Sequence, residues 1–198
     1  MKKIAITGNI ASGKSQVEKE LISLGYRVAD TDKINHFILA SDLNVINEIK
    51  EAFKDDDITN ERGEISREKL GKIVFSVGHK KVKLEEILHK RIFEKLNDFY
   101  EENRNEKIVF VSVPLLFEAK QENNFDKIIF ISADEDIRLE RLIKRNNYTK
   151  EYAKIRIKSQ ESEKNKIEKS DFIIYNNSDL SNLKKQIKEV LNQLILCC

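Results

Sequence analysis

The stretch Gly8-Asn9-Ile10-Ala11-Ser12-Gly13-Lys14-Ser15 matches the pattern G-x-x-x-x-G-K-[ST] at each of its fixed positions. An apolar run at residues 2–7 precedes it, and apolar residues at helical spacing follow it from Val17 onward. Glycines in such a loop let consecutive backbone N–H groups approach phosphate oxygens closely. The positive N-terminal end of the following helix faces the same anion. The sequence therefore predicts a phosphate-binding loop (P-loop) between a strand and a helix.

Residues of this loop have distinct expected tasks. The Lys14 ammonium is expected to reach the β- and γ-phosphates of a nucleotide, and the Ser15 hydroxyl to ligate Mg²⁺. A chance match is the alternative, and the strand and helix on either side argue against it. We expect nucleotide contacts from most of the loop and from the residue after it, namely Gly8, Ala11, Ser12, Gly13, Lys14, Ser15 and Gln16.

Length and composition limit the class of protein. The chain has 198 residues, with 36 Lys and Arg against 34 Asp and Glu, one Pro, six Gly and two Cys. A chain of this length is expected to form one domain and to bury roughly 70% of its unfolded surface. The scarcity of Gly, Pro and Cys excludes collagen-like, low-complexity and disulfide-rich classes. No apolar run approaches the roughly 20 residues that span a bilayer. We expect a cytoplasmic protein with no membrane partner, and an exposed tail without chemistry at Cys197 and Cys198.

Apolar runs and helical patterns alternate along the chain. Near-continuous apolar strands separated by helices predict a five-stranded parallel sheet with helices on both faces. With the phosphate loop, this is an α/β, P-loop nucleoside-triphosphate-hydrolase-like three-layer fold. Ser132 and Glu135 form a capping-box pattern that predicts the start of a helix. The strands are expected at residues 2–7, 27–30, 108–113, 127–132 and 172–175.

Two segments depart from a plain alternation. Residues 34–105 are helical throughout in pattern and too long for an ordinary crossover, so we interpret them as a substrate-side insertion within a single domain spanning residues 1–198. Residues 141–169 hold ten Lys and Arg against four Glu, a surplus of six positive charges. Such a segment indicates an anionic partner or a solvated lysine-rich face, and composition alone leaves both open.

The class of nucleotide-binding protein can be narrowed by what the sequence lacks. A GTPase normally carries an Asp-x-x-Gly switch and an Asn/Thr-Lys-x-Asp base reader, and neither occurs in this chain. An ATPase motor would show a strand that ends in Asp-Glu. The nearest candidate, Asp134-Glu135, lies instead at an expected helix start, where compensation of the helix dipole explains it. The size of the chain, its helical insertion and the basic segment near its end fit a small-molecule kinase better than these other classes.

The sequence Asp30-Thr31-Asp32 lies just beyond the second predicted strand. Carboxyl ends of parallel strands converge on the ligand crevice, so these carboxylates are expected near the phosphate loop. They can serve as a hydroxyl-activating base and as a ligand of Mg²⁺ or water. Helix N-capping by Asp32 alone explains the position equally well.

With these motifs in place, the chain resembles the dephospho-coenzyme A kinases, the family that completes coenzyme A synthesis. The resemblance runs over nearly the full length, and its most specific part is Pro114-Leu115-Leu116-Phe117-Glu118 after a buried strand. The other matching parts are the phosphate loop, residues 30–32, 63–67, 84–89 and 170–171, Leu70, Val74, Phe75, Val113, Arg141, Arg145, Arg156, Gln160 and Asn176.

The resemblance implies the substrates, ATP and dephospho-coenzyme A, and Mg²⁺ as cofactor. It also implies roles for individual residues. Asp32 corresponds to the residue that activates the ribose 3′-hydroxyl of dephospho-coenzyme A. Arg145 resembles a lid arginine that contacts the ATP phosphates, with Arg141 on the same basic lid, residues 141–169. Asn176 stands where the family approaches the adenine. Arg67, His89 and Glu118 resemble positions on the acceptor side.

Departures from the family pattern are modest. The family usually has Gly where Asn9 and Ala11 stand, Thr where Gln16 stands and Pro where Lys90 stands. None of these removes a reacting group, although Asn9 and Ala11 limit how freely the loop can flex.

Two other classes of function remain open on the sequence. One is another small kinase, acting on a nucleoside, a nucleotide or a metabolite such as shikimate; the insertion and the Pro-Leu-Leu-Phe-Glu segment argue against it. The other is a nucleotide-dependent regulatory or nucleic-acid-binding module that docks through the basic segment. Aromatic residues interleaved with the basic ones would favour it, yet only Tyr148 and Tyr152 lie there. We expect no nucleic-acid partner and a monomer, although oligomeric state cannot be derived from these patterns.

Overall fold

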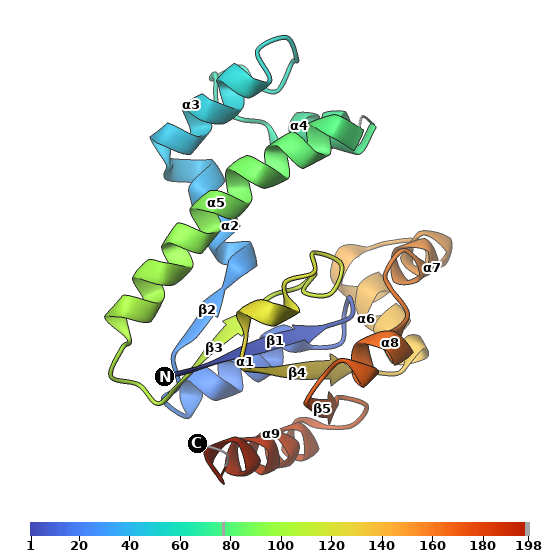
Figure 1. Ribbon diagram of the computed structural model, residues 1–198. Coiled ribbons are helices and arrows are strands. Elements are labelled where there is room, and N and C mark those ends of the chain that lie inside the picture. The colour runs from blue at the N-terminus through green and yellow to red at the C-terminus, as the bar shows by residue number, and fades with distance from the viewer. Residues whose placement is uncertain (77, 197–198) are drawn as a thin grey trace. The chain divides into compact units, whose positions relative to one another are not determined.

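The computed structural model describes residues 1–76 and 78–196 (Figure 1). It divides into two compact units. The first consists of Met1–Asp30 with Asn103–Cys198, and the second of Thr31–Glu102. The expectation for Cys197 and Cys198 lies outside the described residues.

A five-stranded parallel sheet forms the centre of the first unit, with the strand order β2-β3-β1-β4-β5. The central strand, β1, pairs with β3 on one side and β4 on the other, and all strands end at the same edge. The predicted parallel sheet is confirmed. Its strands are β1 (Lys2–Gly8), β2 (Val28–Asp30), β3 (Ile108–Ser112), β4 (Lys127–Ser132) and β5 (Phe172–Tyr175).

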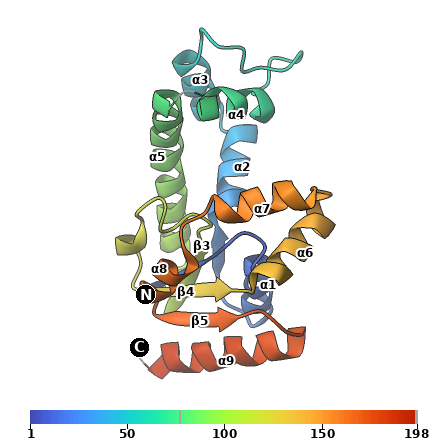
Figure 2. The same ribbon diagram turned by 90° about the vertical axis from the view of Figure 1, so that its right-hand side faces the viewer.

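Helices of the first unit bury the sheet and carry the segments around its carboxyl edge. Residues of α1 (Lys14–Ser23) and α9 (Leu180–Leu196) pack on apolar side chains of β1, β3, β4 and β5, forming one core cluster. A second, smaller cluster joins α6 (Glu135–Asn146) to α7 (Lys150–Lys158). In Figures 1 and 2, α6 begins beyond the carboxyl end of β4 and is followed by α7 and then α8 (Glu163–Glu168). A short 3-10 helix, η1, spans Glu122–Asn124.

The second unit is helical, with its own apolar core. It contains α2 (Thr31–Ser41), α3 (Leu43–Ala52), α4 (Arg67–Ser76) and α5 (Gly78–Glu102). Its buried residues include Ile38, Ile49, Phe53 and Leu88. Among the described residues of the chain, no helix is long and apolar enough to cross a bilayer.

A polar contact fixes the start of α3 inside this unit. The Asp42 carboxylate accepts a hydrogen bond from the Val45 amide and caps the helix. The Arg91 Nε atom donates to the other carboxylate oxygen at 2.5 Å. Burial acts to raise the pKa of Asp42, but hydrogen bonds from Arg91 and Val45 and the Arg91 charge outweigh it, so this pKa lies below its ordinary value of 3.8.

Two local expectations are wrong. Residues 34–105 are not helical throughout, because an antiparallel bridge joins Thr59 to Ile65 around a turn. The capping box is also absent from α6, whose N-cap is Asp134 with no side-chain cap hydrogen bond. The Ser132 hydroxyl instead donates to Glu163, a partner 31 residues away that the local pattern cannot reveal.

Candidate active site

The two glycines of the phosphate loop are required by close contacts. A Cβ atom at Gly8 would lie 2.6 Å from the Ile131 carbonyl oxygen on β4. A Cβ atom at Gly13 would lie 2.0 Å from the Asn176 Nδ2 atom, and the Gly13 backbone has a φ of +99°. A side chain at Gly8 would clash with the backbone of β4, and one at Gly13 would strain the backbone and displace the Asn176 amide.

Ala11 adopts a left-handed conformation with a φ of +62°. This conformation costs a residue with a Cβ atom about 1–2 kcal/mol, so the rest of the structure has to hold the loop in place. The next side chain is also unusual: the Ser12 hydroxyl is buried and has no hydrogen-bond partner. A buried hydroxyl without a partner is costly, and a ligand oxygen entering the loop would satisfy it.

Lys14 lies in a polar triangle with Glu18 and Ser112. Its Nζ atom is 3.0 Å from Glu18 Oε1 and donates to Ser112 Oγ at 2.5 Å. The Ser112 hydroxyl in turn donates to the same Glu18 oxygen. The Glu18 side chain is 5% exposed and that of Lys14 is 17% exposed. The triangle therefore holds the ammonium beside the loop with part of its surface open to a ligand.

Arg141 and Asn176 meet at the Ser12 carbonyl oxygen. Asn176 Nδ2 donates to that oxygen at 2.8 Å, and Arg141 Nη1 lies 3.3 Å from it. Arg141 Nη2 also donates to the Asn176 carbonyl at 3.0 Å. The structure thus brings both residues to the phosphate loop.

Arg145 is placed differently. It is exposed in the last turn of α6, and its Nε atom donates to the neighbouring Asn146 side chain at 2.8 Å. Gln16 is half-buried in the first turn of α1, where its amide donates to the Gly13 carbonyl. Ser15, beside it, has an exposed side chain.

The carboxyl ends of three neighbouring strands are aligned. Asp30, the last residue of β2, pairs in register with Ser112 of β3, and Ser112 pairs with Ile6 of β1, two residues before the loop begins. Asp30 therefore lies at the same sheet edge as the phosphate loop, with β3 between its strand and β1.

The remaining acceptor-side candidates fall in both units. Asp32 is exposed and is the second residue of α2. In the same unit, Arg67 Nη2 donates to the His36 carbonyl at 3.0 Å, and His89 is half-buried on α5. Glu118 belongs to the first unit, where its carboxylate accepts a hydrogen bond from Lys166 at 2.6 Å.

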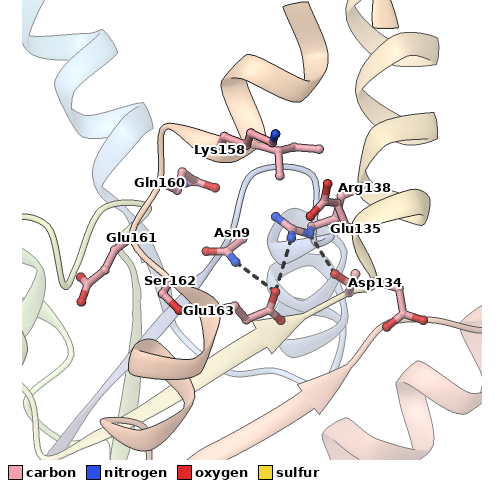
Figure 3. A pocket seen from close by; sticks show the side chains of 11 residues that line it. Asn9, Asp134, Glu135, Arg138, Lys158, Gln160, Glu161, Ser162 and Glu163 are labelled. Atoms are coloured by element: carbon pink, nitrogen blue, oxygen red, sulfur yellow. Dashed lines mark hydrogen bonds and ion pairs between the residues drawn. The ribbon is translucent and has the colours of Figure 1, made fainter. Parts of the chain in front are cut away.

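A cavity of about 440 Å³ lies beside the loop in the first unit (Figure 3). Asn9 and Arg138 line it, together with the segment from Gln160 to Glu163. Figure 3 shows the Asn9 amide and the Arg138 guanidinium both directed at the Glu163 carboxylate. Sequence reasoning missed the roles of Glu18, Arg138, Glu163 and Lys166. Only Glu18 had a local signal, its i, i+4 spacing from Lys14.

Among residues 1–76 and 78–196, no group of three or more His, Cys, Asp or Glu side chains is placed to hold a metal ion.

The fold and site define a P-loop kinase: a strand leads into a phosphate loop with two fixed glycines and a lysine, and a basic helical segment follows β4. The dephospho-CoA kinase family model matches residues 2–182, and the chain belongs to that family. A dephospho-CoA kinase of Fusobacterium nucleatum is 38% identical over 188 residues, covering 93% of this chain and 94% of the relative. One from Listeria innocua is 37% identical over 198 residues, covering 98% of each chain.

Solved structures agree with this assignment. A dephospho-CoA kinase from Campylobacter jejuni has a TM-score of 0.71 at 31% identity, with 97% of this chain and 96% of that chain covered. A Thermus thermophilus protein, TT1252, has a TM-score of 0.84 at 30% identity, with 98% and 97% covered. A shikimate kinase from Bacteroides thetaiotaomicron, 13% identical with a TM-score of 0.56 and coverage of 98% of each chain, shares the fold alone.

Proposed function

We propose that this chain transfers the γ-phosphoryl group of ATP to the ribose 3′-hydroxyl of dephospho-coenzyme A, giving coenzyme A and ADP. The observation that carries the proposal is the family match over residues 2–182. The phosphate loop supports it, because its glycines, lysine and serine are all present in the expected strand–loop–helix context.

On the nucleotide side, the loop N–H groups and the Lys14 ammonium bind the phosphates. The buried Ser12 hydroxyl gains a partner when a phosphate oxygen enters. Asn176 lies toward the adenine, as the family resemblance implies, and Arg141 binds the nucleotide beside it; both residues contact the Ser12 carbonyl. Phosphoryl transfer depends mainly on positioning and charge stabilisation, so these fixed donors supply most of the catalysis.

Ser15 is the residue that would hold Mg²⁺, because its exposed hydroxyl stands in the first turn of α1. When bound there, Mg²⁺ neutralises charge on the transferring phosphoryl group. Arg145 acts from the lid, residues 141–169, and its exposed position suits a side chain that reaches the phosphates only when the lid closes.

On the acceptor side, Asp32 orients the 3′-hydroxyl and takes its proton. Its side chain is exposed, so a substrate hydroxyl can reach the carboxylate. Arg67 and His89 bind the acceptor, and residues 34–105 serve as the substrate-side insertion. Glu118 is proposed for this side as well, although Lys166 holds one of its oxygens. The monomeric state and the cytoplasmic location stay predictions.

An acceptor panel tests the proposal. The purified chain is incubated with ATP and Mg²⁺ and, in turn, dephospho-coenzyme A, shikimate and adenosine, and ADP release is measured. ADP release at least about 100-fold faster with dephospho-coenzyme A than with either other acceptor supports the proposal; a preference of 100-fold corresponds to about 2.7 kcal/mol of transition-state discrimination. Equal release with all acceptors, or a preference for another, overturns it.

A further inference from the structure

Lys166 is a charged side chain in the interior of the first unit. It is 2% exposed, and its ammonium has two partners, Glu118 Oε1 at 2.6 Å and Asn9 Oδ1 at 3.0 Å. A buried ammonium is costly unless it is paired, so these two contacts determine where the side chain can lie. One of the two partners, Asn9, belongs to the phosphate loop.

Asn9 uses both ends of its side-chain amide. Its Oδ1 atom accepts from Lys166, and its Nδ2 atom donates to Glu163 Oε2 at 3.2 Å (Figure 3). The Asn9 carbonyl accepts from the Ser12 amide at 3.0 Å and closes the turn that contains Ala11. A side chain fixed at both ends therefore anchors the first turn of the loop.

Glu163 is itself held from two other elements. Ser132, at the end of β4, donates to its Oε1 atom, and Arg138 Nη2 on α6 lies 3.4 Å from its Oε2 atom. Arg138 is 5% exposed and its Nε atom donates to the Ala133 carbonyl at 2.9 Å. The cluster holds two basic and two acidic groups whose charges balance: Lys166, Arg138, Glu118 and Glu163. A cluster with balanced charges can stabilise this part of the fold without binding a ligand.

The same segment contacts the loop a second time. Gln160 Oε1 accepts from the Ile10 amide at 2.7 Å. Residues 160–166 therefore bind two consecutive loop residues, Asn9 and Ile10, just before the strained residue Ala11. Strained backbone persists only where the surrounding structure determines it, and these contacts do so here.

We propose that Lys166 is a positioning residue for the phosphate loop, acting through Asn9, with Glu118 as its counter-ion. It holds the loop turn in the conformation that receives the triphosphate. The inference rests on the proposed function, since the triphosphate is the donor substrate in that reaction. It makes Glu118 a support of the nucleotide loop in addition to its proposed acceptor-side role.

Nucleotide affinity is the readout, because it can be measured whether or not dephospho-coenzyme A is the acceptor. Binding of a non-hydrolysable ATP analogue with Mg²⁺ is measured by calorimetry for Lys166→Met, Lys166→Arg and Lys164→Met. Lys164, exposed on the same helix, is the matched control. We expect at least a ten-fold loss of affinity for Lys166→Met, recovery to within three-fold of the wild type for Lys166→Arg, and less than two-fold loss for Lys164→Met.

A double-mutant cycle separates positioning from general destabilisation. In an Asn9→Gly background, adding Lys166→Met is expected to weaken affinity by less than two-fold, because the connection to the loop is already gone. Full additivity of the two changes overturns the proposal, as does unchanged affinity in Lys166→Met. If Lys166→Met does not fold, Asn9→Gly decides alone: a loss of five-fold or more supports the proposal, and a smaller loss overturns it.

Discussion

The Lys14 ammonium and the Glu18 carboxylate lie 3.0 Å apart across one turn of α1, and Ser112 on β3 binds both. The contact fixes the lysine beside the loop before any ligand arrives. Because a lysine has three donor hydrogens, it can keep both contacts and still reach a phosphate oxygen. The loop lysine is therefore oriented by the fold in advance.

Replacement of Lys14 by Ala should nearly abolish phosphoryl transfer. The lysine is the loop's charged donor to the phosphates, and loss of one oriented donor at a transition state costs about 10²–10³ in rate. Initial rates of ADP formation under saturating substrates measure the effect. A kcat within ten-fold of the wild type would contradict the assigned role.

Replacement of Glu18 by Ala should lower both stability and turnover. It removes the carboxylate that both the Lys14 ammonium and the Ser112 hydroxyl contact, and loss of such a buried acceptor costs about 1–3 kcal/mol. Urea denaturation and kcat are measured beside Glu140→Ala, an exposed glutamate on α6 whose loss should change stability by less than about 0.5 kcal/mol. Equal behaviour of the two variants would show that the triangle has no energetic role.

Replacement of Asp32 by Asn should reduce turnover without weakening ATP binding. A general base contributes about 10²–10⁴ to the rate, and Asn keeps the size of the side chain but cannot take a proton. We expect a kcat at least about 100-fold lower, with ATP affinity within two-fold of the wild type. The capping interpretation of this residue is wrong, because Asp32 is the second residue of α2 and not its N-cap. A purely structural role in the first turn of α2 predicts an unchanged kcat.

Replacement of Asp42 by Asn should remove a pH-dependent part of the stability. Arg91 lowers the pKa of Asp42 in the folded chain, so its contribution is complete above the ordinary value of 3.8 and is lost as the pH falls through the lower folded-state value. Asn keeps the N-cap acceptor and removes the charge. Urea denaturation of both proteins should show a stability difference that is constant from pH 7 to about pH 5 and shrinks below pH 3.8. A difference that stays constant down to pH 3 would contradict the cause assigned to the lowered pKa.

The central sheet could be predicted from sequence because its signals are local. Buried parallel strands appear as continuous apolar runs, and the glycines of the loop mark its fixed positions. A helix does begin at Glu135 as predicted, but its cap could not be predicted, because the Ser132 hydroxyl binds Glu163 instead of capping the helix. Propensity and spacing describe neighbours along the chain, and this partner is supplied by the tertiary fold.

The residues that support the phosphate loop could not be predicted from the sequence, for the same reason. Lys166 stands in a lysine-rich segment whose other lysines suggest a solvated face, yet it is buried between Glu118 and Asn9, which are 48 and 157 residues away. Composition cannot separate one buried lysine from its exposed neighbours. The resemblance did point to Gln160 and Glu118, and the structure supplies contacts for both.

The most direct test of the account is the identity of the product formed from dephospho-coenzyme A, ATP and Mg²⁺. The account predicts a product with the mass of coenzyme A whose added phosphate is on the ribose 3′-hydroxyl, as read by phosphorus and proton NMR, and formation of this product at least about 100-fold more slowly with Lys14→Ala. Absence of the product from the wild-type reaction, or a phosphate at any other position, would contradict it.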